Sequence, residues 1–184
     1  MASPTTGTST EDLRALVEGH EPASPREVAA KERFLSELGR LTAPCDEHAG
    51  PIHVTASGIV VGRRGTVLHR HKKLGIWMQP GGHIDAGERS EAAARREATE
   101  ELGLAVEHPS TGPMLLHLDV HEAAHAHTHL DLRYLLLAAD TDPTPPPDES
   151  PDARWCSWDE ALQMADPALI DALPLARAAY EAMA

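Results

Sequence analysis

The sequence has few aromatic residues and little positive charge. Its 184 residues include three Trp, two Tyr and one Phe, too few for the stacking surface that binds single-stranded nucleic acid. The 16 Lys and Arg are outnumbered by 29 Asp and Glu, which gives a formal net charge of -13. Such a chain lacks the basic stripe that binds an extended phosphate backbone or an anionic membrane. If it binds phosphates, it needs metal ions or a local cluster of basic residues.

Long apolar runs and cysteine pairs are also missing. The longest apolar run, Tyr134 to Ala139, is far too short to cross a bilayer, and Met1 to Thr10 lacks the apolar stretch of a secretory signal. Cys45 and Cys156 have no CxxC spacing and form no disulfide framework. We therefore expect a cytoplasmic protein whose length suits one domain with a sizeable core.

Hydrophobic patterns predict a helical extension followed by an α/β sandwich. Residues 1–9 are expected to be a loose tail, with helices beginning at Thr10 and at the capping box that starts with Ser24. We predict that the tail and extension span residues 1–48 and that the main domain spans residues 49–184. Within the main domain, strands are expected at 52–61, 66–71, 104–107, 114–120 and 128–138, and helices at 90–102, after Ser157 and after Asp166, the last of these broken or kinked at Pro174.

Three glutamates on the expected central helix form an acidic face. Glu97, Glu100 and Glu101 stand at i, i+3 and i+4, so a helix places them side by side. Three like charges destabilise a helix unless they are solvated, paired or bound to a cation, and Mg2+ prefers such oxygen ligands. Taken alone, however, an E-x-x-E-E pattern is more often a solvated helix surface.

The spacing around these glutamates is more specific than the acidic face. It consists of Gly82, five residues, Glu88, seven residues and then REATEELGL, which runs from Arg96 to Leu104. This segment resembles the Nudix box, G-x5-E-x7-R-E-U-x-E-E-x-G-U, and matches every fixed position. Ala98 is a small member of the hydrophobic class expected at the position marked U.

The resemblance extends beyond the box. The lead-in GIWMQPGG, from Gly75 to Gly82, looks like the W-x-x-P-G-G that is common in the Nudix family. The segment WCSWDE, which begins at Trp155, resembles the family's late strand-to-helix junction. By element order, the family pattern covers roughly residues 50–165.

The resemblance implies a fold, a reaction and a set of roles. The fold is the Nudix fold, an α/β/α sandwich around a mixed β-sheet. The reaction is Mg2+- or Mn2+-dependent hydrolysis of a nucleoside diphosphate linked to another moiety, by attack of water at phosphorus. One of the glutamates, or a carboxylate elsewhere, would be the general base. The implied catalytic residues are Glu97, Glu100, Glu101, Arg96 and Glu88, with Arg96 and Glu88 paired, and the implied metal ligands are the three glutamates of the acidic face and the carbonyl of Gly81.

Two further groups of residues are candidates for binding the small-molecule substrate. Five of the 16 basic residues fall between Arg63 and Lys73 and could form a phosphate clamp; the alternative is a basic strand edge that favours solubility. From His127 to Arg133, alternate polar residues share one face of an expected strand. These histidines could bind substrate, act as acids or hold a second metal, or they could be ordinary surface or packed residues. The candidates are Arg70, Trp77, His83, His127, His129 and Asp131.

Two alternatives to a hydrolase remain open. Isopentenyl-diphosphate isomerase is similar in fold and uses a His/Glu metal site, and His53 and His83 resemble two of its ligands. Gly81, however, stands where that family has a cysteine, and neither Cys45 nor Cys156 is near it in the sequence. The second alternative, a non-catalytic binding module, usually loses box carboxylates, and none is lost here. The sequence does not identify the diphosphate substrate, the general base or the number of metals. It also leaves open whether the protein forms a homodimer.

Overall fold

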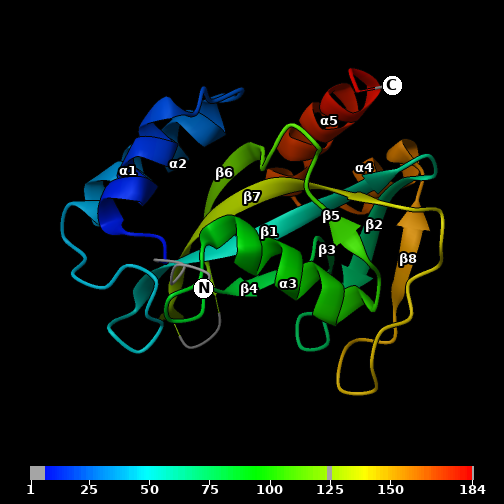
Figure 1. Ribbon diagram of the computed structural model, residues 1–184, viewed down its shortest axis with the longest axis horizontal. Helices are drawn as coiled ribbons and strands as arrows, with labels where there is room; N and C mark the ends of the chain where they lie inside the picture. The colour runs from blue at the N-terminus through cyan, green and yellow to red at the C-terminus, as the bar shows by residue number, and fades with distance from the viewer. Residues whose placement is uncertain (1–6, 124–125, 184) are drawn as a thin grey trace, which may run out of the picture.

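The computed structural model describes residues 7–123 and 126–183, so residues 1–6 of the predicted tail and His125 lie outside the described part (Figure 1). Within it, eight strands form one mixed sheet: β1 (Ile52–Gly62), β2 (Gly65–Arg70), β3 (Trp77–Met78), β4 (Gly81–His83), β5 (Val106–Glu107), β6 (Leu115–Glu122), β7 (Thr128–Ala138) and β8 (Ala153–Cys156). The strand order is β3-β2-β1-β7-β5, with β4 paired to β1, β6 to β7 and β8 to β2. Only β1 and β7, among these pairs, run parallel.

The described helices are α1 (Thr10–Gly19), α2 (Pro25–Leu38), α3 (Ser90–Leu102), α4 (Trp158–Met164) and α5 (Pro167–Glu181). Helix α3 lies on one face of the sheet, α4 and α5 on the other, and α1 and α2 lie together beyond β6 (Figure 1). The predicted α/β/α sandwich around a mixed sheet is therefore confirmed. No helix in the described ranges is long and apolar enough to span a membrane.

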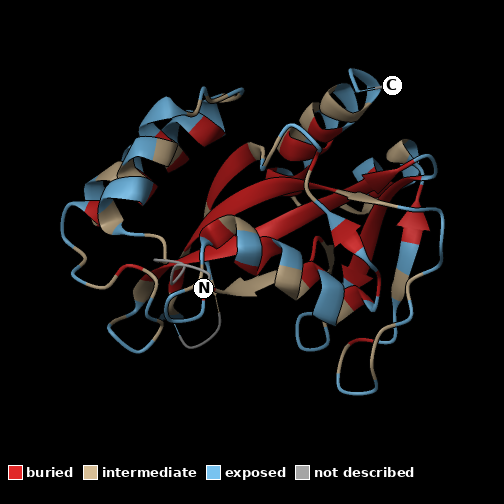
Figure 2. Ribbon diagram, viewed as in Figure 1, coloured by how far each residue is buried: buried red, intermediate tan, exposed pale blue. Residues whose placement is uncertain are grey.

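Strand β1 is buried on both faces, which follows from its place at the centre of the sheet (Figure 2). Val60 belongs to the same apolar cluster as Ala98 and Leu102 of α3. Its neighbour Ile59 belongs to the cluster that contains Leu169 of α5. Because successive strand residues point to opposite faces, β1 and β7 can carry core residues on one face and functional side chains on the other.

Local signals set most helix ends. The side chain of Ser24 accepts a hydrogen bond from the backbone N–H of Glu27, which starts α2 as expected. Gly103 ends α3 in the left-handed conformation, at φ 56, where a Cβ atom would also lie 1.9 Å from the carbonyl oxygen of Thr144. The predicted break at Pro174 is wrong, because α5 runs through it. Ala172, Leu173 and Ala176 are buried in the cluster that contains Ile59 of β1, and this packing outweighs the local cost of the exposed proline.

The helical extension is part of the core. Leu13 of α1 and Phe34 of α2 are buried in the same cluster as Val54 of β1. Residues 7–9 are not loose, contrary to the prediction, because Thr8 donates its N–H to the carbonyl of Glu88 at 3.1 Å and its hydroxyl accepts from the N–H of Ser90 at 2.8 Å. The second of these hydrogen bonds satisfies the N–H of Ser90, one of the donors that have no partner within α3. The boundary between residues 48 and 49 stays a prediction.

Candidate active site

Helix α3 holds two carboxylates against the backbone of β4. The backbone N–H of Gly81 donates a hydrogen bond of 2.9 Å to Oε2 of Glu101. At Gly82, a Cβ atom would lie 2.6 to 2.8 Å from the carboxylate atoms of Glu97. Gly82 therefore lets Glu97 approach the strand, whereas Gly81 lets β4 lie close to Ser57 of β1, since a Cβ atom there would be 2.3 Å from the Cβ of Ser57.

Arg96 joins this acidic cluster to the loop before α3. Its guanidinium donates two hydrogen bonds to Glu88, at 3.0 and 2.9 Å, and one to the carbonyl of His83 at 2.9 Å. The remaining nitrogen donates to Glu97 at 2.7 Å and to Glu100 at 3.2 Å. The hydrogen bonds to Glu88, followed by those to Glu97, raise the pKa of Arg96, which remains charged. The expected Arg96–Glu88 pair is thus part of a five-bond network that fixes the orientation of the cluster.

Arg96 brings positive charge to Glu97 and Glu100 but forms no hydrogen bond with Glu101. Burial raises the pKa of Glu101 to about 8 despite the hydrogen bond from Gly81, and the nearby Glu97 carboxylate raises it further. Burial also raises the pKa of Glu97, although Arg96 opposes this. His69, 3.8 Å from Glu101, supplies no charge because burial lowers its pKa to about 4. Carboxylate oxygens that are fixed in place and outnumber the guanidinium beside them fit a divalent metal such as Mg2+.

A cleft of about 360 Å³ borders this cluster. Glu101, Gly81 and Gly82 form one side of it. The opposite side comes from the face of β1 and β7 that does not contact α3. The other polar residues along the cleft are Thr55, Ser57, His71, Lys73, Gln79, His121, Glu122, His129, Asp131, Arg133 and Asp166.

Buried polar groups of β1 and β7 form the floor of the cleft. Asp131 accepts hydrogen bonds from the hydroxyls of Ser57 at 2.7 Å and Thr55 at 3.0 Å, and from Nε of Arg133 at 3.1 Å. Arg133 is 2% exposed, and its Nη2 donates to Asp119 at 3.0 Å. Its Nη1 has no hydrogen-bond partner among the described residues. A buried guanidinium with a free N–H pair in a cleft is well suited to bind an anion.

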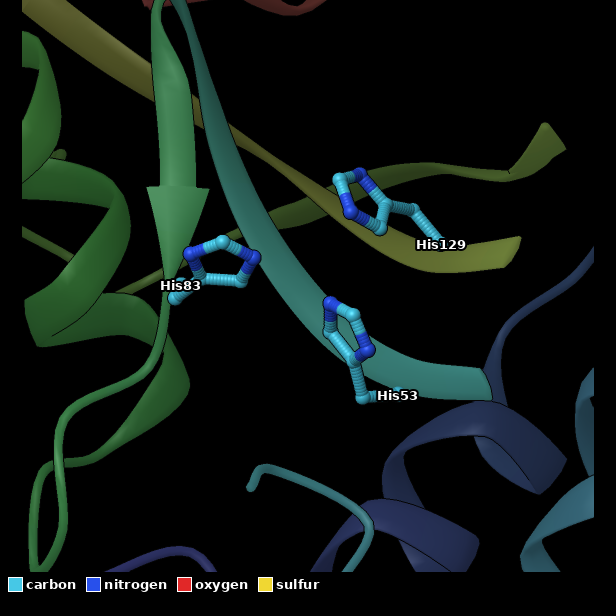
Figure 3. Close-up of side chains that lie close together, drawn as sticks. All are labelled: His53, His83 and His129. Atoms are coloured by element: carbon cyan, nitrogen blue, oxygen red, sulfur yellow. The ribbon is translucent and has the colours of Figure 1, made fainter. Parts of the chain in front are cut away.

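Three histidines converge beside the cleft (Figure 3). His53 on β1, His83 on β4 and His129 on β7 each offer one ring nitrogen, and these atoms lie within 4.8 Å of one another. The ring centroid of His53 is 5.0 Å from that of His83 and 4.8 Å from that of His129. Burial, then neighbouring histidines, lowers the pKa of His53 and lowers that of His129 to about 4. Both rings are therefore neutral at pH 7.

Some of the predicted substrate-binding residues lie at the cleft, and others do not. His129 and Asp131 line the cleft, and His83 and His127 lie beside it, with the ring of His127 centred 5.2 Å from that of His53. Arg70 and Trp77 are absent from the lining. Arg70 donates its Nε to the carbonyl of Gly75 at 3.0 Å, and Trp77 stacks with the guanidinium of Arg154 at 5.1 Å and packs on the α4–α5 side.

Sequence reasoning missed other cleft residues. Arg133 lies on the same alternate face as His129 and Asp131, so the period-two pattern already contained the signal for it. Lys73 belongs to the basic segment in which only Arg70 was singled out. Ser57 carried no signal, because it lies within an apolar strand and meets Asp131 only through the pairing of β1 with β7.

A second cavity, of about 660 Å³, lies on the far side of His83. It is bordered by residues 7–10, 42–48 and 83–88. Cys45, Glu47 and His83 therefore share one lining, although Cys45 is distant from His83 in the sequence. Burial raises the pKa of Cys45 to about 11, so its thiol is protonated at pH 7.

Comparisons with known proteins agree with this geometry. The family model described as NUDIX domain matches residues 51–176, well over half of the chain. A hydrolase of the NUDIX family from Clostridium perfringens is similar in structure, with a TM-score of 0.58, 28% identity, and coverage of 72% of this chain and 98% of that one. The MutT NUDIX hydrolase from Burkholderia pseudomallei has a TM-score of 0.53 and 29% identity, covering 64% of this chain and 93% of that one. An Ap4A hydrolase from C. elegans, at 21% identity, a TM-score of 0.57 and coverage of 71% and 98%, shares the fold.

Proposed function

Since this chain belongs to the Nudix family and is a Nudix hydrolase, we propose that it cleaves a phosphoanhydride bond in a nucleoside diphosphate linked to another moiety, with Mg2+ or Mn2+. One observation carries the proposal. Glu101 is hydrogen-bonded to Gly81 at the edge of a 360 Å³ cleft. Arg133 lines the same cleft, and its buried Nη1 has no hydrogen-bond partner in the described part of the chain. The same cleft therefore borders a carboxylate cluster that can bind a cation and a guanidinium that can bind an anion.

The metal would be held by Glu97, Glu100, Glu101 and the carbonyl of Gly81. When bound, it supplies charge neutralisation of the diphosphate and activation of the attacking water. Arg96 keeps Glu97 and Glu100 oriented through its hydrogen bonds, and Glu88 holds Arg96. One carboxylate of the cluster takes the proton from the attacking water as general base.

The cleft would bind the substrate's phosphates opposite the carboxylate cluster. The free Nη1 of Arg133 is fixed there because Asp131 and Asp119 hold the rest of the guanidinium. Lys73, an exposed residue of the lining, adds a second positive charge. Together they account for how a protein of net charge -13 binds an acidic substrate. Cytoplasmic location and a homodimer stay predictions.

The test is a hydrolysis screen with Mg2+ and with Mn2+ over nucleoside triphosphates, nucleotide sugars, ADP-ribose, dinucleoside polyphosphates and prenyl diphosphates. Products are identified by phosphorus NMR. Glu101→Gln is the variant expected to be inactive, and Glu107→Gln, which changes an exposed glutamate on β5, is the matched control expected to be active. We expect metal-dependent cleavage that a chelator abolishes.

Other outcomes of the screen would contradict the proposal. Interconversion of prenyl diphosphates without hydrolysis would support the isomerase alternative. Tight binding of a panel compound without turnover in either metal would support a binding module.

A further inference from the structure

We propose that His53, His83 and His129 form a transition-metal site that is separate from the carboxylate cluster and binds Zn2+ or a similar ion. Three strands contribute one histidine each, and their rings point toward one another (Figure 3). The three nitrogen atoms lie within 4.8 Å of one another. With metal–nitrogen bonds of about 2.0 to 2.1 Å, one ion can contact all three after small side-chain adjustments.

The backbone explains why the three rings meet. In the parallel pairing of β1 and β7, His53 stands directly opposite His129. In the antiparallel pairing of β1 and β4, His83 stands opposite Thr55, two residues after His53 and on the same face. The sheet itself therefore positions the site, so the cluster does not depend on the conformation of a loop.

His53 is the strongest sign of a ligand at this place. It is 0% exposed, and neither of its ring nitrogens forms a hydrogen bond of normal geometry among the described residues, although the backbone of Gly50 is near enough to act on its pKa. Burying an unpaired polar group is costly, and buried polar side chains are almost always satisfied. A metal ion held jointly with His83 and His129 would satisfy the acceptor nitrogen of a neutral imidazole.

The ligand type selects the ion. Neutral imidazoles suit Zn2+, Cu2+, Ni2+ and Fe2+, whereas Mg2+ prefers oxygen ligands such as those of the Glu97 cluster. Glu47 lies 3.3 Å from Nδ1 of His83, which is the arrangement by which a carboxylate orients a metal-binding histidine. The two sites thus differ in the metals that they bind.

The two sites are linked through β4. Gly81 and Gly82 contact Glu101 and Glu97. The next residue, His83, places its ring in the histidine site, and its carbonyl accepts a hydrogen bond from Arg96. His129 also lines the substrate cleft. An ion at the histidine site would therefore lie at the wall of that cleft, with its remaining coordination positions available to water or a phosphate group.

The experiment uses full-length protein without a histidine tag, stripped of metal and then kept in excess Mg2+ so that the carboxylate site is filled. Zn2+ binding is measured by calorimetry, and Co2+ is used as a spectroscopic probe because its visible absorption distinguishes nitrogen-rich, low-coordinate sites from octahedral oxygen sites. The variants are His53→Ala, His83→Gln and His129→Gln. The matched control is His48→Gln, an exposed histidine on the loop that precedes β1. Glu97→Gln serves as the carboxylate-site variant.

We expect one Zn2+ per chain in the parent protein, His48→Gln and Glu97→Gln. Each ligand variant should weaken Zn2+ binding at least about 100-fold and lose the visible Co2+ bands. Because His53 is buried, thermal melts check its fold, and His83→Gln, at a half-exposed position, remains decisive if His53→Ala unfolds.

Equal Zn2+ affinity in His83→Gln and the parent would overturn the proposal. Visible Co2+ bands that disappear in Glu97→Gln but persist in His129→Gln would also overturn it, because the ion would then be bound at the carboxylate site. The proposal does not rest on hydrolysis. An inactive protein that binds Zn2+ through these histidines would contradict the proposed function alone.

Discussion

The backbone N–H of Gly81 donates a 2.9 Å hydrogen bond to Oε2 of Glu101, which fixes this carboxylate to strand β4. The hydrogen bond stabilises the anion, but burial outweighs it and keeps the pKa of Glu101 near 8. Glu101 is thus fixed in position, and a bound cation would stabilise its negative charge.

Glu101→Gln tests this arrangement. The amide preserves the shape of the side chain but removes the negative charge, so we expect turnover to fall at least about 100-fold while the melting temperature is maintained or rises. Steady-state kinetics at saturating Mg2+ and thermal unfolding measure both effects. Glu107→Gln should behave like the parent, and near-normal turnover in Glu101→Gln would remove this residue from the catalytic set.

Gly82→Ala tests the close approach of α3 to β4. The added methyl group would lie 2.6 to 2.8 Å from the carboxylate of Glu97 and must push it away. We expect about a 100-fold loss of kcat/KM, because a displacement of about 1 Å is enough to misalign a catalytic group. Gly19→Ala is the matched control, since nothing lies within 4 Å of a Cβ atom there. A kcat/KM of Gly82→Ala equal to that of the parent would mean that the position of the Glu97 carboxylate does not affect catalysis.

Lys73→Ala tests the cleft as the phosphate-binding region. Lys73 lines the cleft, whereas its neighbour Lys72 donates to the carbonyl of Asp148 outside it. We expect Lys73→Ala to raise KM roughly threefold to tenfold, with kcat little changed and a larger effect at low salt. Lys72→Ala should leave KM unchanged. Equal effects of the two variants would indicate a general influence of charge and no specific contact.

Glu27→Gln tests the attachment of the helical extension. Burial alone would raise the pKa of Glu27, but hydrogen bonds from His20 and from the N–H groups of Ala23 and Leu118 hold it at about 2. The folded protein therefore gains stability that is complete above pH 4.5 and is lost as the pH falls toward 2.

In Glu27→Gln we expect the free energy of unfolding at pH 7 to fall by about 2 kcal/mol and its decline between pH 5 and 2 to become shallower. Urea unfolding across this pH range measures both quantities. Glu21→Gln, at an exposed glutamate in the α1–α2 connection, is the control. If the free energy of unfolding fell with pH in the same way in the parent and in Glu27→Gln, ionisation of Glu27 would not contribute to stability in acid.

Local patterns predicted the helices, the longer strands and the carboxylate cluster, but not the short strands β3 and β4. The box from Gly82 to Leu104 is contiguous, and one helix with its preceding strand is enough to bring Glu97, Glu101 and Gly81 together. The cap at Ser24 and the capping box at Ser157 likewise act over three residues, although at Ser24 the expected return bond from Glu27 does not form, because that carboxylate accepts from the N–H of Ala23. Such short-range signals are present in the sequence itself.

The remaining parts of the site depend on strand pairing between distant segments. The sequence offers the basic segment from Arg63 to Lys73 as either a phosphate clamp or a basic strand edge, with Arg70 as a candidate; in the structure Arg70 donates to the carbonyl of Gly75 and does not line the cleft. It noted His53 and His129 for separate reasons, and only the parallel register of β1 and β7 makes them partners. A register between strands is set by burial and pairing over the whole sheet, which no short motif encodes.

The parallel pair of β1 and β7 also dictates when the site can form. Strand β1 ends at Gly62, yet the strand that completes its central pairing begins at Thr128, so most of the main domain must be synthesised before the two can meet. Pairings of high contact order form slowly, because a long loop must close before they yield any stabilisation. During translation, the residues of helix α3 therefore leave the ribosome well before the strand that completes the cleft has been made.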